Sequence, residues 1–216
     1  MQPPIRVTDP SIAAHDRVFR ALRTRIMHGE IEPGASLTLR GIGKSFDVSM
    51  TPAREAVRRL VAEGALSLSS SGRVSTPLLS NERIEELASL RALLETELAS
   101  RALPRAHLAL IERLEAINDR VKQMVRQHDA SGYIRMNLEF HRTLYLRAQA
   151  PAFLAMTETV WLQLGPTMRS LYGRLNRTEP PVQHKHILAA LRAGDEPSLR
   201  LAVRTDATQG LRMLKG

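Results

Sequence analysis

The sequence predicts a mainly α-helical protein made of two parts, a small N-terminal unit with a β-hairpin and a larger bundle of six helices. Three observations predict it. Apolar residues recur at helical spacing through most of the chain. One short stretch of alternating residues surrounds a glycine, which is typical of a hairpin. Aromatic residues make up only 4% of the chain, so the core has to be mostly aliphatic, which suits packed helices.

The N-terminal unit, residues 1–77, is expected to begin with two helices. The first runs from about 12 to 28, because residues such as Leu22 and Ile26 recur at helical spacing. A shorter helix follows over about 39 to 46, and a tight break comes directly after it.

The third helix of this unit is expected to begin at Thr51, whose hydroxyl can cap it. Pro52 then takes the first helical position, where its missing N–H would have no partner anyway. Alternation on both sides of Gly72 predicts the hairpin. Helix, short helix, tight turn, capped helix and hairpin is the order of a winged helix-turn-helix with a β-hairpin wing.

In that fold the second helix of the pair enters the major groove, and its N-terminal residues meet base edges. Thr51 and Arg54 would therefore lie near DNA, where an arginine can donate two hydrogen bonds to guanine. The partial positive charge of the helix N-terminus also suits a phosphate, and Gly72 would let the wing backbone approach DNA closely. For Arg58 or Arg59 taken alone, a solvated surface position is the simpler interpretation.

Charge and composition support a nucleic-acid partner and exclude other classes. The formal net charge is +9, from 31 Lys and Arg against 22 Asp and Glu, and a positive field attracts polyanions. The absence of cysteine excludes disulfides, thiolate metal ligands and cysteine nucleophiles. The N-terminus lacks the apolar core of a signal peptide, and no apolar run approaches the roughly 20 residues of a membrane span. We therefore expect a cytoplasmic protein with no membrane partner.

The second unit, residues 78–216, begins within a short linker at residues 77–80, and beyond this linker its pattern is helical throughout. Its expected helices cover about 81–103, 106–128, 131–148, 151–176, 181–193 and 196–214.

The N-terminal third resembles a known family. Residues 47–60 read DVSMTPAREAVRRL, and with residues 26–34 they resemble the DNA-binding domain of the GntR family of bacterial regulators. By that resemblance the DNA-contact positions are taken by Arg40, Thr51, Arg54 and Gly72, with Ser49 and Met50 in the same turn.

Met50 departs from the family pattern, which usually has arginine at this position. A thioether cannot donate a hydrogen bond to a base or a phosphate, although it can pack against a thymine methyl. The sequence therefore predicts an altered operator preference or weaker binding, without loss of DNA recognition.

Residues 78–216 resemble the FCD ligand-binding domain of the FadR subfamily, through the segments 90–95, 137–141 and 184–188. Six helices suit its shorter, VanR-like branch. The resemblance implies a homodimer whose second domain binds a small organic acid as effector.

The same resemblance implies a divalent metal such as Zn²⁺, Ni²⁺, Mn²⁺ or Mg²⁺, held in the family by one Asp and three His. Here the corresponding positions are Asn137, His141, His184 and Asp206. One carboxylate, two imidazoles and a weak amide ligand can still hold a metal. Three interpretations stay open: a site that binds metal more weakly, a site without metal, and two ordinary core histidines with satisfied hydrogen bonds.

Arg91 matches a family arginine that faces the effector pocket, where a guanidinium would bind a carboxylate. The alternative is a surface ion pair with Glu95, four residues later on the same helix.

The function expected is that of a sequence-specific transcription regulator, a dimeric repressor whose binding to a palindromic operator is modulated by the effector. Two alternatives remain. A metal-dependent hydrolase is disfavoured because the sequence has no HExxH motif, nucleophile elbow or glycine-rich phosphate loop. A nonspecific architectural protein would bind operator and random DNA equally well.

Overall fold

The computed structural model describes residues 13–69, 72–174 and 182–212. Its N-terminal helices are α1 (Ala14–Met27), α2 (Leu39–Phe46) and α3 (Met50–Ala62). The strands are β1 (Ser36–Leu37), β2 (Ser67–Leu68) and β3 (Val74–Ser75). The second part consists of α4 (Asn81–Ala102), α5 (Leu108–Arg126), α6 (Ala130–Tyr145), α7 (Pro151–Arg174), α8 (Val182–Ala193) and α9 (Glu196–Arg212).

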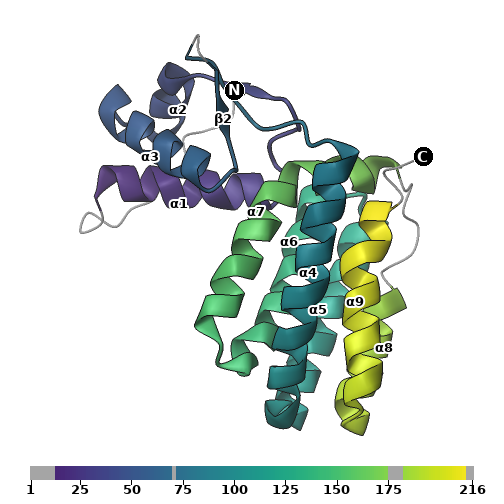
Figure 1. Cartoon of the computed structure of the whole chain (residues 1–216). Coiled ribbons are helices and arrows are strands. Elements are labelled where there is room, and N and C mark those ends of the chain that lie inside the picture. Colours follow the sequence, from purple (N-terminus) through teal and green to yellow (C-terminus); the bar gives the residue numbers. More distant parts are fainter. Residues whose placement is uncertain (1–12, 70–71, 175–181, 213–216) are drawn as a thin grey trace.

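The N-terminal part is built around the packing of α1 on α3. Leu22 and Ile26 of α1 are fully buried with Ala53 and Leu60 of α3, so the apolar stripes predicted from helical spacing form its core. Figure 1 shows that α2 and α3 lie on the far side of α1 from the helical bundle.

The expected hairpin is present and gains a third strand. The sheet is antiparallel in the order β1-β3-β2, with Ser75 paired to Ser36 on one side and to Ser67 on the other. The extra strand β1 has only two residues, which is too short to produce a recognisable alternation in the sequence.

Helix α3 begins two residues earlier than expected, so the prediction that Thr51 caps it is wrong. The helix starts at Met50, and Ser49 is the capping residue in an extended conformation. Pro52 therefore occupies the third helical position, which is tolerated because none of the first N–H groups of a helix has a partner within it.

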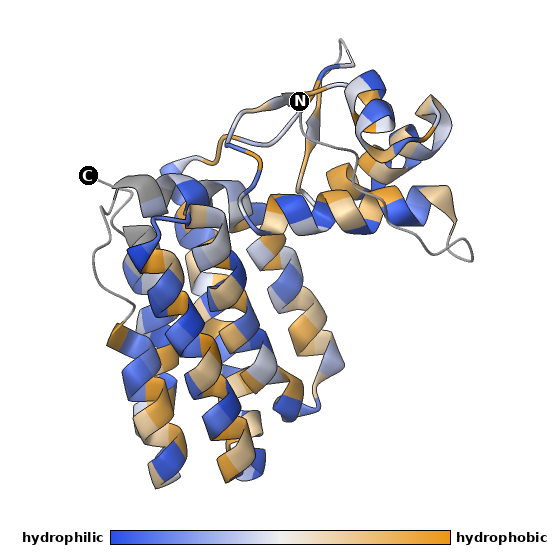
Figure 2. Cartoon of the chain, turned by 180° about the vertical axis from the view of Figure 1, so that it is seen from behind, coloured by the Kyte–Doolittle hydropathy of each residue, from blue (hydrophilic) through white to orange (hydrophobic). Residues whose placement is uncertain are grey.

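The six helices α4 to α9 form a bundle, as predicted, and the ends that the structure gives them lie within three residues of those expected. Hydrophobic and hydrophilic residues both occur along the helices of the bundle (Figure 2). The central core is formed mainly by large aliphatic and aromatic side chains, among them Leu98, Leu114, Phe140, Leu144, Ile187 and Leu199. Helix α4 packs against α9, and α5 packs against α6.

The two parts are in close contact where α1 meets α7. A Cβ atom on Gly165 of α7 would overlap the carbonyl oxygen of Ile26 in α1. Beyond the end of α1, Gly29 has a φ of +65° and its carbonyl accepts a hydrogen bond from Arg169 at 3.1 Å. Leu162 of α7 belongs to the core of the N-terminal part. Because the two helices are packed without space between them, a displacement of α7 would also displace α1.

Within the described ranges, no helix combines the length and apolar character that crossing a membrane requires.

Candidate DNA interface and effector site

The first turn of α3 is an exposed surface. Ser49, Met50, Thr51 and Arg54 are all exposed, and the exposed fraction of Met50 is 43%. The side chain of Ser49 makes no capping hydrogen bond. The first backbone N–H groups of α3 therefore remain available, together with the positive end of the helix dipole, for an outside acceptor.

Arg40 at the start of α2 and Arg54 in α3 are exposed guanidinium groups. Neither forms an ion pair or a side-chain hydrogen bond with any of the residues that the structure describes. Such arginines can donate to a partner without first breaking an internal contact.

The other two arginines of α3, Arg58 and Arg59, form ion pairs with carboxylates of the same chain. Arg58 lies 3.8 Å from Glu55, and Arg59 donates to Asp16 of α1 at 2.5 Å while stacking 3.7 Å above the ring of Phe19. The hydrogen bond from Arg59 lowers the pKa of Asp16. Arg59 thus ties α3 to α1, and the pairing of Arg58 agrees with the surface position expected for it.

Gly72 lies at the edge of the wing with a φ of +78°. Its chain neighbours apart, no atom of the described residues lies within 4 Å of the place where its Cβ would be. A side chain would have ample space here, so packing does not explain the glycine. Its positive φ does, because this backbone conformation is unfavourable for residues with a Cβ atom.

Inside the bundle, three of the four predicted metal ligands meet. One ligand atom each of His141, His184 and Asp206 lies within 4.8 Å of the others. They come from α6, α8 and α9, so only the tertiary fold brings them together. Nε2 of His141 is 2.9 Å from Oδ2 of Asp206, and both histidines are completely buried.

The histidine rings are oriented by neighbours that the sequence did not reveal. Nδ1 of His184 lies 2.9 Å from Oδ1 of Asn118, an acceptor, so this nitrogen carries the proton and Nε2 carries the lone pair. Nδ1 of His141 lies 3.2 Å from the hydroxyl of Tyr145, which itself donates to Glu95 at 3.0 Å. His141 therefore also directs a proton outward and a lone pair inward.

Two imidazole lone pairs and one carboxylate consequently converge on one buried point. Without a metal, a proton on Nε2 of His141 would pair with Asp206. Burial alone would raise the pKa of this carboxylate, but the charge and hydrogen bond of such a protonated His141, with smaller effects of His184 and Arg91, would hold it well below its usual range. A negative carboxylate beside electron-rich nitrogens needs a compensating proton or cation. This donor set fits a divalent metal.

Arg91 is buried and pairs with Glu95, with Nε donating to Oε1 at 2.6 Å. The pairing with Glu95 is confirmed, but its expected place on the surface is wrong. Burial would lower the pKa of Arg91, whereas the charge of Glu95 and its hydrogen bond raise it. Trp161 also donates to Glu95, at 2.9 Å, so the carboxylate is fully satisfied in the interior.

Asn137 and Arg91 line a small cavity beside this cluster. Asn137 lies one helical turn before His141 on α6 and is buried. The cavity has a volume of about 20 Å³ and also reaches Met27 of α1 and Gly165 of α7. This volume is close to that of a single water molecule.

Sequence reasoning missed Glu95, Tyr145, Trp161 and Asn118 as parts of the site. Glu95 was recognised only as a surface partner, because a glutamate in a helix is rarely fully buried. The pKa of Tyr145 is raised well above its usual value by burial and then by Glu95, which no local pattern in the sequence signals.

Comparison with known families covers both parts of the chain. Residues 14–74 match the bacterial regulatory proteins of the gntR family, and residues 86–207 match the FCD domain. The first match runs from α1 into β3, and the second runs from α4 into α9.

Named relatives are similar over most of the chain. The HTH-type transcriptional regulator McbR of Escherichia coli K12 is 26% identical over 201 residues, 92% of this chain and 91% of that protein. The gluconate operon transcriptional repressor of Bacillus subtilis is 32% identical over 154 residues, 71% of this chain and 61% of that protein.

Solved structures share the fold. The structure of E. coli McbR/YncC superposes with a TM-score of 0.83 at 23% identity, covering 95% of this chain and 100% of that chain. A GntR-type regulator from Rhodococcus sp. RHA1 gives a TM-score of 0.78 at 22% identity, covering 94% and 97%.

Proposed function

Because the chain belongs to the GntR family of bacterial transcription regulators and carries an FCD domain, we propose that it is an effector-responsive repressor that binds a palindromic operator as a homodimer. The family and its relatives are transcription regulators and not enzymes, so the hydrolase alternative is dropped. The name of the gluconate operon repressor supports the repressing role. We place the boundary between DNA-binding and effector domains after Pro77, between the two family matches.

The observation that carries the proposal is the exposed first turn of α3, with open backbone donors and the guanidinium of Arg54, which pairs with none of the described residues. Inserted into the major groove, this turn would bring base-reading and phosphate-binding groups to DNA together. Met50 adds an apolar contact that suits a thymine methyl. The proposed contact residues are Arg40, Ser49, Met50, Thr51, Arg54 and Gly72.

The experiment starts by selecting operator sequences from a random DNA pool with the full chain, followed by gel-shift titration. Removal of the Arg54 side chain takes away a bidentate base contact worth about 1–3 kcal/mol. We expect Arg54→Ala to weaken operator binding by about fivefold to a hundredfold and to relax selectivity at one position of each half-site.

Arg58→Ala is the matched control, because Arg58 lies on the same helix and already pairs with Glu55. Its operator affinity should stay within about twofold of the unmodified chain. Equal losses in both variants, or equal affinity of the unmodified chain for operator and random DNA, would contradict specific reading by α3.

We propose further that His141, His184 and Asp206 hold a divalent metal, with Asn137 as a weaker fourth ligand. The support is the convergence of two lone pairs and a carboxylate at a buried point. A bound metal would supply an open coordination position for the carboxylate of an effector.

The effector would be a small organic acid gripped by Arg91. Only Nε of Arg91 is used by Glu95, so the other guanidinium N–H groups can meet a carboxylate in the cavity that Arg91 lines. Since that cavity is far smaller than an organic acid, binding has to push its walls apart. Met27 of α1 is one of those walls.

Movement of Met27 would link the effector to DNA. Helix α1 carries α3 on its other side and is tied to it through Arg59 and Asp16. A displaced α1 would change the angle between the two DNA-binding domains of the dimer, and hence the free energy of binding both half-sites at once.

The homodimer interface is proposed on the face shared by α4 and α9, which lie side by side (Figure 1). Two large apolar side chains are exposed on this face, Leu93 at 69% and Leu201 at 68%. They flank a surface hollow of about 460 Å³. An exposed apolar patch of this kind could meet its own copy across a two-fold axis.

A further inference from the structure

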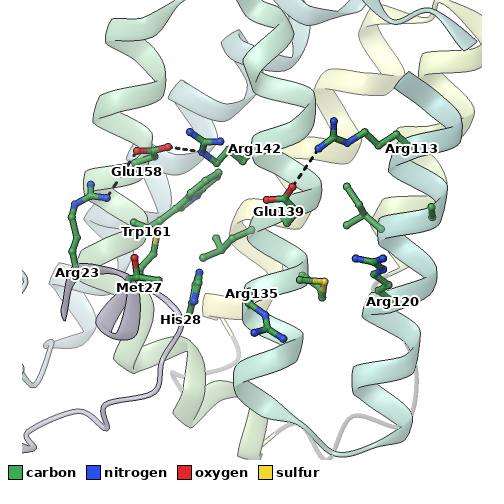
Figure 3. Close-up of a pocket in the computed structure, with 15 residues that line it drawn as sticks. Arg23, Met27, His28, Arg113, Arg120, Arg135, Glu139, Arg142, Glu158 and Trp161 are labelled. Atoms are coloured by element: carbon green, nitrogen blue, oxygen red, sulfur yellow. Dashed lines mark hydrogen bonds and ion pairs between the residues drawn. The ribbon is translucent and has the colours of Figure 1, made fainter. Parts of the chain in front are cut away.

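A second and much larger cavity lies on the opposite side of α1 from the DNA-binding surface, and we call it the arginine groove. It has a volume of about 690 Å³ and is lined by residues of α1, α5, α6 and α7 (Figure 3). Its arginines are Arg23, Arg113, Arg120, Arg135 and Arg142. Against these five positive charges the lining provides two carboxylates, Glu139 and Glu158.

The two carboxylates are engaged by three of the arginines. Arg142 donates to Glu158 at 2.9 Å, and Arg23 approaches the same carboxylate at 4.0 Å. Arg113 lies 3.7 Å from Glu139. Arg23 also donates to Glu63, at 2.9 Å, so three carboxylates face these three arginines and their charges are balanced.

Arg120 of α5 and Arg135 of α6 are different. Both are exposed, and neither has an ion pair or side-chain hydrogen bond among the residues that the structure describes. Figure 3 shows them on the same side of the groove as His28, away from the dashed ion pairs. The uncompensated positive charge is thus gathered at one end of the groove.

The positive charge at this end of the groove affects the pKa of His28. Burial is the main cause that lowers its pKa; Arg135 lowers it further, while Glu30 acts in the opposite direction. Arg135 is therefore close enough to repel a proton from His28. An anion bound at this end would relieve that repulsion and gain charge-assisted hydrogen bonds from planar guanidinium groups.

We propose that the arginine groove is a binding site for a compact anion with at least two negative charges, a phosphorylated or polycarboxylic metabolite, anchored by Arg120 and Arg135. The apolar walls next to these groups, Met27, Leu138 and Trp161, accommodate the carbon skeleton of such a molecule. The same three residues also line the small inner cavity beside Arg91. They separate the groove from the proposed effector site, so the two sites are distinct.

The position of the groove gives its occupant a regulatory consequence, which rests on the proposed function. Arg23, Met27 and His28 come from the DNA-binding domain, whereas Arg120 and Arg135 come from the bundle. A ligand that contacts both sides binds best at one placement of α1 on the bundle, and by linkage its binding favours that placement. The anion would thus stabilise one orientation of α3 from behind.

The test is isothermal titration calorimetry of the full chain with sodium pyrophosphate and, separately, with sodium citrate, at constant ionic strength. We expect saturable one-to-one binding of at least one probe. The probe with the higher affinity identifies phosphate or carboxylate as the recognised group. Replacing both anchors, Arg120→Ala with Arg135→Ala, should weaken binding about tenfold or more, because each removes a charge-assisted hydrogen bond.

Arg126→Ala is the matched control, since Arg126 is an exposed arginine of α5 outside the groove lining. It should bind the probes as the unmodified chain does. All variants keep His141, His184 and Asp206, so chelation of a bound metal by the probes cannot produce the difference. Absence of saturable binding of either probe, or equal affinity in the double variant, would overturn the proposal.

Regulation is measured in a second arm, by operator gel shift with and without saturating probe. A change of at least threefold in operator affinity, absent in the double variant, supports coupling, and an unchanged affinity overturns it. Calorimetry requires no DNA, so the outcomes are separable. A chain that binds the anion but selects no operator refutes the proposed function and leaves the groove site standing.

Discussion

Asp206 is the residue on which the metal proposal depends most directly, because it supplies the only carboxylate of the cluster. We expect Asp206→Ala to lower the metal content of the purified chain, measured by inductively coupled plasma mass spectrometry, to well below one ion per chain. The unmodified chain should contain close to one ion, and EDTA should lower its melting temperature.

Asp195 provides the matched control for this measurement. It is an aspartate near the start of α9 that caps the helix through Ser198, outside the buried cluster. Asp195→Ala should reduce stability by about 1 kcal/mol without changing the metal content. If the unmodified chain contains no metal and EDTA leaves its melting temperature unchanged, the metal proposal is wrong.

His28 determines a pH-dependent part of the folding free energy. Burial lowers its pKa from 6.5, so below that value the unfolded chain binds more protons at this position than the folded chain. The contribution of His28 to stability is therefore complete above about pH 6.5 and decreases as the pH falls toward its lowered folded pKa.

The measurement is urea denaturation at several pH values between 5 and 8. Between pH 7.5 and pH 5.5, we expect His28→Gln to lose less unfolding free energy than the unmodified chain. A substitution of the exposed His107 by glutamine serves as a control, although it also removes a helix cap. Identical pH profiles for the unmodified chain and His28→Gln would show that His28 titrates normally.

For individual residues, the sequence predicted which residues come together better than it predicted how deeply they are buried. His141, His184 and Asp206 are implied by the family resemblance, and the fold brings them together. The burial of Arg91 and Glu95 was not foreseen, since a charged pair four residues apart in a helix has the same spacing whether it faces solvent or core.

For whole elements, helical periodicity predicted nine helices in the described ranges, and all of them are present. The errors lie at ends and in short pieces. Thr51 was expected to cap α3 because Ser, Thr and Pro all favour the first turn, and sequence alone does not rank them. Strand β1 exists only because β3 provides its partner, so no local pattern could reveal it.

The contact between α1 and α7 provides a prediction at this scale. Gly165→Ala would place a methyl group against the carbonyl of Ile26 and the backbone of Met27. We expect the two helices to be forced apart, with a loss of about 1–3 kcal/mol of unfolding free energy in urea denaturation.

The same variant should also bind operator with altered affinity, because α1 carries the DNA-binding surface. Gly194→Ala is a useful comparison, since its φ of +66° makes the substitution strained while no described residue beyond its chain neighbours comes within 4 Å of the new Cβ. Gly194→Ala should lower stability without changing operator affinity. Unchanged stability in Gly165→Ala would mean that the junction is loosely packed.

For the whole molecule, the α4–α9 face predicts the oligomeric state. We expect size-exclusion chromatography with light scattering to give about twice the chain mass of 24.1 kDa for the unmodified protein. Leu93→Glu combined with Leu201→Glu would introduce four like charges at a two-fold interface and should yield monomers. A palindromic operator should then be bound much more weakly, because one chain contacts one half-site.

Leu146→Glu controls for the general effect of placing a charge at an exposed leucine, since Leu146 is half exposed and lies outside the α4–α9 face. It should remain dimeric. A dimer that survives the paired substitution would place the two-fold axis on another surface.

Neither the arginine groove nor the Glu95 network could be predicted from the sequence. The groove combines residues more than 130 positions apart, from Arg23 to Trp161. No periodicity or motif joins them, because helix packing alone decides which exposed faces become neighbours. Family resemblance pointed to the exposed first turn of α3 and to the cluster of His141, His184 and Asp206, which the fold brings together; their binding of DNA and of metal stays a proposal.

Trp161 is the only tryptophan of the chain, and it forms part of the wall between the inner cavity and the arginine groove. Its indole N–H is held by Glu95, so a molecule that enters either space changes the polarity or the hydrogen bonding around one chromophore. The protein therefore contains its own optical reporter. Its ultraviolet emission can follow ligand arrival at either space in real time, without an attached dye.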